Sequence, residues 1–419
     1  MASTKPTGSI PNLMAVLWTL PDDIIYYMSR EFIQEPSDLS TLSRTCHHLS
    51  RLLDPLLYRA DILKTRREEL ETEIRLLGEN RFFGLYDGPD FDVRINYQAA
   101  RVPVNQITAL HWAATRDDKS LGLEIAQKSI RAALIHWPNY LHVRCSKTKG
   151  MTPLQLAAKF GHEDMARELI EASPFVDARV YMRPAEKGEL PWFDRMGCGR
   201  SQAIFNYDQA SFKMMANALS IAIISGKVRI AEMLAHQTQE LAESSGREVQ
   251  DLVPAPKLAA LHKMPSVIRI LRARGYRSQM VNDYFYQAKP LHLAAVMDNN
   301  EETLQLLLTE ENVLRDGDLF GREAIAWALE HGCVSNSLFL VKHYSLEERA
   351  EMIPRHFRRF LEQDDLLPVF EALLEGNTVA PDEIHSLKTT NLDIYRSGGR
   401  LGRTPKTREF LLRHPEFDF

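Results

Sequence analysis

The residue types that could support catalysis begin with one cysteine on a glycine-rich segment. Gly197-Cys198-Gly199 places a thiol on a loop. A nucleophilic thiol needs a base held beside it, and the sequence ties no histidine or acid to this position. We therefore interpret Cys198 as an ordinary loop cysteine.

Two other short motifs resemble ligand loops but lack essential residues. The run from Asp316 to Gly321 begins like a calcium loop, yet Phe320 stands where a third oxygen ligand belongs and Trp327 where a bidentate glutamate is needed. The run from Gly398 to Gly402 lacks the spacing and the Lys-Ser/Thr pair of a phosphate loop. We expect no metal site, no cofactor and no catalytic residues, so the chain is predicted not to be an enzyme.

The histidines at positions 47, 48, 111, 162 and 292 have no cysteine partners at zinc spacing. Structural roles are therefore favoured for them. Basic residues gather at 355–359 and in the C-terminal segment, at Arg396, Arg400, Arg403, Lys406 and Arg408. A solvated surface is the default reading of these patches, and an acidic partner segment is the alternative.

Composition limits the remaining possibilities. A chain of 419 residues is too long for one compact core, so two or more units are expected. The formal net charge of -5 argues against nucleic-acid or membrane attachment through a basic field. The four cysteines form no Cys-x-x-Cys pair, which favours a reducing compartment. The apolar run 13–20 does not look like a signal peptide, so we expect a soluble, cytoplasmic and/or nuclear protein.

The segment 18–60, after an N-terminal tail at 1–17, has a helical pattern. Pro21 suits a first helical turn, and Ile24, Met28 and Phe32 then recur at every fourth position. A break at 36–38 precedes a second apolar stripe, which we expect to end at Asp54-Pro55 before a short third helix. Two interpretations are open: a small three-helix cap on the following domain, or a unit that buries apolar residues against a partner.

A charged helix is predicted from Asp61 to Leu77, with an apolar stripe of Leu63, Leu70, Ile74 and Leu77, ending at Gly78. An irregular linker completes the segment 61–102. We expect the N-terminal unit and the domain beyond this linker to have separate cores.

The remainder of the chain contains internal repeats. The clearest copy is the phrase Gly150 to His162, in which Thr152 can cap a helix begun by Pro153 and Gly161 permits the turn after it. Related phrases begin near positions 108, 218, 258, 289 and 321, and Leu291 and Ile325 lie 34 positions apart. The period predicts five or six stacked helix pairs over 103–345, with an insertion at 174–217, capping helices at 346–376 and a C-terminal tail at 377–419.

These phrases resemble ankyrin repeats, and the N-terminal motif resembles an F-box. The F-box resemblance rests on four stretches, Leu20 to Ile24, Leu39 and Leu42, 45–48 and 54–58. Together they span about a tenth of the chain. Two positions depart from the motif, because Leu49 and Tyr58 stand where F-boxes often carry tryptophan. The order is similar to that of F-box/ankyrin proteins of filamentous fungi. It implies an all-α chain, with a three-helix F-box followed by an ankyrin solenoid of helix pairs joined by β-hairpin-like turns.

The resemblance also implies a function. An F-box docks on the Skp adaptor of a cullin-RING ubiquitin ligase, and the residues carried over to that contact are Leu20, Pro21, Ile24, Ile25, Met28, Leu39, Leu42, Cys46 and Leu49. The expected role is a non-catalytic substrate-recognition subunit, a monomer within a hetero-complex. The alternative is an ankyrin-repeat scaffold or adaptor acting outside ubiquitination.

The target protein is expected to contact inner-face residues of the repeats and the insertion, namely Trp112, Arg116, Lys159, Phe160, Trp192 and Met297. For Trp112, core packing is the competing interpretation. The insertion is rich in aromatic residues, which are frequent interface anchors, although they could equally pack on the solenoid itself.

Overall fold

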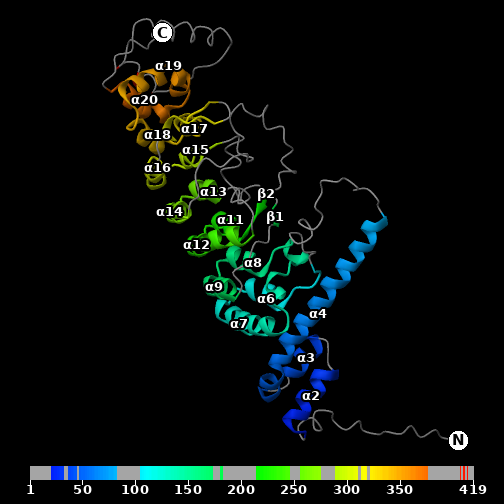
Figure 1. Cartoon of the computed structure of the whole chain (residues 1–419). Coiled ribbons are helices and arrows are strands. Elements are labelled where there is room, and N and C mark those ends of the chain that lie inside the picture. The colour runs from blue at the N-terminus through cyan, green and yellow to red at the C-terminus, as the bar shows by residue number, and fades with distance from the viewer. Residues whose placement is uncertain are drawn as a thin grey trace, which may run out of the picture. The chain divides into compact units, whose positions relative to one another are not determined.

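The described residues of the computed structural model are 20–32, 36–44, 47–82, 104–172, 180–182, 214–245, 255–274, 288–309, 313–318, 321–375, 406, 409–410 and 413. They are mostly helical and fall into two compact units, Met1–Val180 and Tyr181–Phe419 (Figure 1). Two three-residue strands, β1 (Val180–Met182) and β2 (Met214–Ala216), pair in a small sheet. The predicted helical class is present, with this small sheet in addition at the two ends of the predicted insertion; residues 183–213 lie outside the described part.

Three helices open the first unit: α2 (Asp22–Phe32), α3 (Pro36–Ser43) and α4 (His47–Phe82). The carbonyl of Pro21 accepts the N–H groups of Ile24 and Ile25, each at 3.1 Å, so α2 begins immediately after the proline. The three helices share one apolar core, made of Ile25, Leu39, Leu49, Leu53, Leu56 and Ala60. The helical pattern predicted for this segment is thus present.

The helix α4 is longer than predicted. It continues through Pro55 and Gly78, so both expected helix ends are wrong. An internal proline costs about 3 kcal/mol, but Leu53 and Leu56 on either side of it are almost fully buried, and each such side chain stabilises the fold by about 1.5–3 kcal/mol. Burial therefore outweighs the proline, and one helix of 36 residues connects the N-terminal module to the predicted connecting helix.

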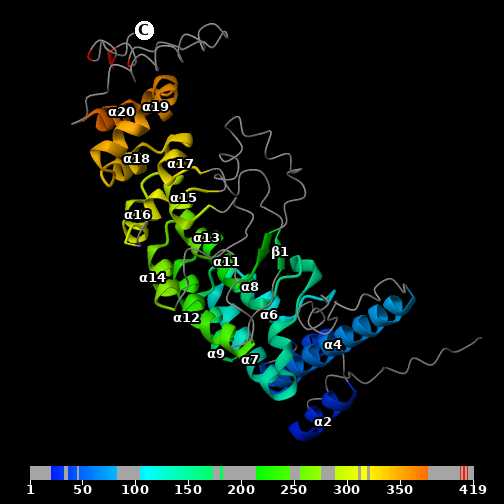
Figure 2. The same cartoon turned by 45° about the horizontal axis from the view of Figure 1, so that its top comes forward.

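The first unit then contains two helix pairs. They are α6 (Ala109–Ala114) with α7 (Lys119–His136), and α8 (Pro153–Phe160) with α9 (Glu163–Ala172), with 3-10 turns η1 (Pro138–His142) and η2 (Ser146–Thr148) between them. The first helices of the two pairs contact each other, as do the second helices (Figure 2). The pairs therefore stack in parallel order.

The ends of α8 follow the local sequence signals. The Thr152 hydroxyl accepts the Gln155 N–H at 3.3 Å, and the Gln155 side-chain oxygen accepts the Thr152 N–H at 2.9 Å. These two bonds form a capping box, and Pro153 occupies the first helical turn. Gly161 ends the helix with a φ of 78°, a conformation that glycine adopts without steric cost. The predicted cap and turn are confirmed.

The second unit contains four further pairs. They are α11 (Ala218–Ile224) with α12 (Val228–Ser245), α13 (Ala255–Leu261) with α14 (Pro265–Ala273), α15 (Pro290–Ala295) with α16 (Glu301–Leu307), and α17 (Ala324–Glu330) with α18 (Val334–Val341). Successive first helices contact each other, and so do successive second helices. The described part of the chain thus holds six helix pairs, the upper end of the predicted number.

Two buried asparagines connect successive pairs of the second unit. The Asn336 amide donates to the carbonyls of Ala295 at 3.0 Å and Met297 at 2.9 Å, and its oxygen accepts the Asn300 N–H at 3.0 Å. Asn300 in turn donates to the Ala260 carbonyl at 2.9 Å. Since both side chains are buried, each supplies hydrogen bonds that water cannot.

The C-terminal end of the second unit is closed by α19 (Leu346–Glu362), the 3-10 turn η6 (Asp364–Leu366) and α20 (Leu367–Leu374). Phe370 stacks on Phe360 with ring centroids 4.9 Å apart and contacts Phe410 at 5.0 Å. Phe410 is fully buried, so the region 377–419, predicted to be a tail, contributes a core residue. The predicted capping helices are present, and Phe410 extends their core.

We predict that Asn336→Ala lowers the free energy of unfolding of the second unit by about 2 kcal/mol or more, because it leaves buried carbonyl and N–H groups without partners. Urea unfolding followed by circular dichroism measures this change. Gln305→Ala, at an exposed position of α16, is the matched control and should change stability by less than about 0.5 kcal/mol. Equal effects of the two substitutions would show that the asparagine contacts contribute nothing specific.

Candidate functional site

The outward face of α2 is an exposed apolar surface. Ile24, Tyr27 and Met28 are 40%, 59% and 43% exposed, and their spacing of three and four residues places them on one side of the helix. Pro21 is exposed beside them. Neighbouring exposed side chains of this size are typical of a contact surface. Tyr27 was not among the predicted contact residues, although the helical period from Ile24 indicates it.

The other residues predicted to contact an adaptor hold the module together. Ile25, Leu39 and Leu49 are at most 4% exposed. Leu20 and Leu42 are partly buried and pack against the same core, while Cys46 lies outside the described residues. Direct contact with a partner is therefore available to Pro21, Ile24 and Met28, whereas the buried leucines and Ile25 act by keeping α2 in place.

A polar stripe of α4 contacts the first helix pair and the turns beside it. The contacting residues recur at intervals of three, four and seven, so they share one face of the helix. The contacts are Asp54 with Lys128 at 2.7 Å, Asp61 with Tyr140 and Ala109, Thr65 with Gln106 at 2.8 Å, and Glu68 with Asn105 at 2.6 Å. Together with the packing of α4 on α7, they join the N-terminal module to the first pair. The N-terminal apolar cluster contains no residue of the helix pairs, so the expected separate cores stay a prediction, while these contacts attach the module to the first pair.

Asp61 is the central residue of this junction. Its carboxylate accepts the N–H of Ala109, the first residue of α6, at 3.0 Å, and it accepts a short hydrogen bond from the Tyr140 hydroxyl. The first N–H groups of a helix have no partner within the helix, so a carboxylate is stabilised there. Burial raises the pKa of Asp61, and the hydrogen bonds from Tyr140 and Ala109 partly oppose this shift. Burial and the nearby Asp61 raise the pKa of Tyr140, which stays a hydrogen-bond donor.

We predict that Asp61→Ala destabilises the first unit by about 2–4 kcal/mol, because the Ala109 N–H and the hydroxyl of the buried Tyr140 lose their shared acceptor. Hydrogen exchange should accelerate in both α4 and α6. The control is Asp117→Ala, which removes an exposed carboxylate. If exchange accelerates in α4 alone, the carboxylate does not couple the module to the first pair.

A second exposed surface lies on the first helices of the two pairs in unit one. The Arg116 guanidinium lies 4.3 Å from the centre of the Trp112 ring, and the Lys159 ammonium lies 5.8 Å from the centre of the Phe160 ring. Trp112 is 39% exposed and Phe160 46%, so neither ring is a core residue. The contact between α6 and α8 places Trp112, Lys159 and Phe160 on adjacent helices, and Arg116 follows directly after the end of α6.

The other two predicted target-binding residues are not part of this surface as described. Met297 belongs to the second unit and is partly buried against a core cluster that includes Leu293 and Trp327. Trp192 lies outside the described residues. Of the six predicted target-binding residues, the four of the first unit therefore form one exposed surface.

Comparison with protein families matches residues 149–179 to the ankyrin repeat. An ankyrin repeat is present there. The matched residues include α8 and α9 and the phrase from Gly150 to His162, which the sequence indicated as the clearest copy. No curated protein matches the chain. Ankyrin repeats are protein-binding modules, so the match supports a role in protein–protein interaction.

Two histidines, His111 and His292, each connect their own helix pair to the next pair along the chain through a ring nitrogen. His111 Nε2–H donates to the Met151 carbonyl at 3.0 Å, which leaves Nδ1 to accept the Thr108 hydroxyl at 2.6 Å. His292 Nε2–H donates to the Arg322 carbonyl at 2.9 Å. Both rings are fully buried, and burial lowers the pKa of each to about 4. The predicted structural roles of these histidines are confirmed.

The lowered pKa values predict a pH dependence. A buried neutral histidine contributes stability above the unfolded pKa of about 6.5, and this contribution is lost as the pH falls towards the folded value of about 4. For His111 the loss between pH 7 and pH 5 is about 2 kcal/mol. Gln155 stands at the position of its repeat that corresponds to His111. His111→Gln should therefore be tolerated, and it should reduce the loss of stability of unit one between pH 7 and pH 5 by about 2 kcal/mol. Urea unfolding at both pH values measures it, and unchanged pH dependence would show that His111 titrates normally.

The remaining candidate chemistry has structural explanations. The Asp318 carboxylate pairs with Arg322 at 2.7 Å and accepts the Trp327 N–H at 3.0 Å, so it stabilises a hairpin. Phe320 and Cys198 lie outside the described residues. Within the described ranges, no group of three or more histidine, cysteine or acidic side chains is placed to hold a metal. No described helix combines the length and apolar character needed to cross a membrane.

Proposed function

We propose that this chain is a non-catalytic substrate receptor of a Skp–cullin–F-box ubiquitin ligase. In this role α2 docks on the Skp adaptor, and the ankyrin repeats bind the protein to be modified. The observation that carries the proposal is the exposed apolar face of α2, which directly follows the Leu20-Pro21 turn and is held by a buried three-helix core. A face of this kind on so small a module is suited to a helical partner groove.

The junction between α4 and the first pair supports the mechanism. A substrate receptor acts by holding its target near the transferring subunit, and such proximity is lost if the two binding modules move freely. The single helix α4 and the Asp61 hydrogen bonds fix the docking module to the first helix pair. In the proposed role this chain supplies orientation, and the transfer chemistry belongs to other subunits.

The exposed surface on α6 and α8 is the proposed target-binding region in unit one. The rings of Trp112 and Phe160 offer apolar contact area, and aromatic and arginine residues often dominate binding energy. Arg116 and Lys159 have no ion-pair partner in the described part of the chain, so both charges are available to a target.

We predict that Ile24→Glu/Met28→Glu weakens binding to purified Skp adaptor at least tenfold, because two charges enter an apolar contact. Circular dichroism should change little, since both side chains are exposed. Leu346→Glu, which adds a charge at an exposed leucine of α19, is the control and should bind normally. Isothermal titration calorimetry measures the three affinities, and equal affinity of the double variant would overturn the docking assignment.

A second experiment separates the ligase role from the alternative scaffold role. Native co-purification should recover a cullin together with the adaptor if the chain is a ligase receptor. Recovery of the adaptor without a cullin would favour a scaffold, and recovery of neither would remove the F-box interpretation.

A further inference from the structure

The helix α4 has a second face, opposite the one that contacts the first helix pair. Asp54, Asp61 and Glu68 mark the inward face, and Leu63, Arg67 and Leu70 lie about half a turn away from it. Leu63 is 40% exposed and Leu70 is 46% exposed, and they are seven residues apart. The apolar stripe expected from the sequence is therefore present at these two positions, but it is not covered by any described part of the chain.

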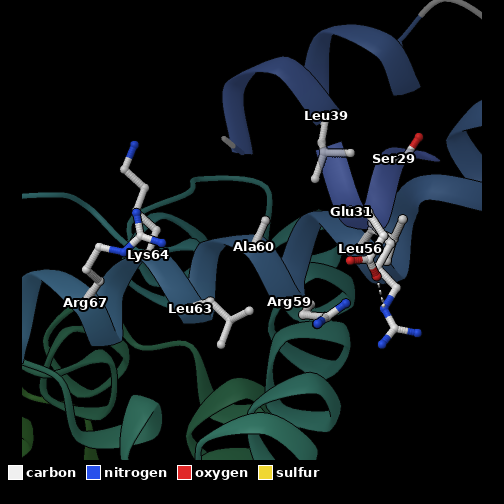
Figure 3. A pocket seen from close by; sticks show the side chains of 10 residues that line it. Ser29, Glu31, Leu39, Leu56, Arg59, Ala60, Leu63, Lys64 and Arg67 are labelled. Atoms are coloured by element: carbon white, nitrogen blue, oxygen red, sulfur yellow. Dashed lines mark ion pairs between the residues drawn. The ribbon is translucent and has the colours of Figure 1, made fainter. Parts of the chain in front are cut away.

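A pocket of about 250 Å³ lies at the N-terminal end of this outer face. It forms where α4 meets α3 and the end of α2, and its apolar wall comes from Leu39, Leu56, Ala60 and Leu63 (Figure 3). The size suits one or two apolar side chains of a partner. The pocket, Leu63 and Leu70 together make an apolar track along this side of α4, with Arg67 between the two leucines.

Cationic side chains gather at the pocket end of this track. Arg30, Arg59, Lys64 and Arg67 line the pocket, against one carboxylate, Glu31. That carboxylate is already paired with Arg30 at 3.4 Å. Arg59 and Arg67 have no ion-pair partner in the described part of the chain. The local charge is therefore strongly positive, although the whole chain carries a formal charge of -5.

We propose that the outer face of α4 binds an acidic amphipathic helix of a partner protein. Exposed leucines at i and i+7 match the apolar side of a helix, and the pocket accepts an anchoring side chain at one end of the track. The unpaired guanidinium groups of Arg59 and Arg67 attract carboxylates on the flanks of the incoming helix. A second copy of this chain fits less well, because it would bring more cations to the same rim. This proposal does not depend on the ubiquitin-ligase role.

Synthetic peptides test the charge requirement directly. The probe is a fluorescent helix of about 20 residues with leucines on one side and glutamates on the flanks. Matched peptides replace every glutamate with glutamine or with lysine. Fluorescence anisotropy with the full chain should show binding of the glutamate peptide at least tenfold tighter than of either matched peptide, and the difference should shrink at high salt. Equal binding of all three peptides overturns the proposal.

Variants of the full chain locate the binding site. Arg59→Glu/Arg67→Glu should lose at least tenfold in affinity for the glutamate peptide and gain affinity for the lysine peptide. Arg131→Glu, at an exposed arginine of α7, is the control and should bind the glutamate peptide normally. Leu70→Gln, a neutral change at an exposed position, should also weaken binding and keeps the test valid if the charge reversal disturbs folding. Unchanged affinity in Leu70→Gln and in the charge-reversed chain overturns the assignment.

Two other occupants of the face would give different results. A concentration-dependent dimer that is lost in Leu70→Gln would identify a second copy as the occupant and overturn the proposal. Binding to phosphatidylserine vesicles that depends on Arg59 and Arg67, without binding of the glutamate peptide, would identify a lipid surface and also overturn it. Sedimentation and vesicle co-flotation distinguish these outcomes.

Discussion

The partly buried carboxylate of Asp61 is the constraint on which the first unit depends. It accepts hydrogen bonds from the first residue of α6 and from Tyr140, and it lies on the same helix that completes the N-terminal core. A buried charge without such partners is unfavourable, so the carboxylate specifies how α4 meets the first pair. The exposed apolar face of α2 and the exposed surface of α6 and α8 are both held on elements that meet at this junction.

Stacking of the pairs imposes a second constraint. One short helix pair cannot bury its own apolar face, so each pair depends on its neighbours. Polar contacts between pairs keep the register: the rings of His111 and His292 donate to the carbonyl ahead of the next pair, and Asn300 and Asn336 bond carbonyls of earlier pairs. Because these groups are buried, each lost contact leaves an unpaired polar atom, which makes sliding of one pair on another unfavourable.

Local signals were predictable from the sequence, and distant ones were not. Thr152, Pro153 and Gly161 act within one helix and its turn, so their roles follow from spacing alone. The positions of His111 and His292 in the repeated phrase likewise indicated structural roles. By contrast, Pro55 is a helix breaker by local rules, and only the burial of Leu53 and Leu56 explains its place inside α4. Tyr140 and Phe410 pair with residues far along the chain, and no short pattern indicates such contacts.

Acidic and basic residues of α4 lie on different faces of the helix. The acidic face attaches the N-terminal module to the first helix pair, and the basic face is exposed. Acidic residues at 54, 61 and 68 recur every seven positions and turn towards Lys128, the N-terminus of α6 and Asn105. The cations Arg59 and Arg67 take the opposite side. A basic residue in place of Asp61 would face the N–H groups at the start of α6 and would be repelled by them. The inward acids of α4 therefore each have a donor or cation of the first pair or its turns as partner, while Arg59 and Arg67 lie on the other side of the helix.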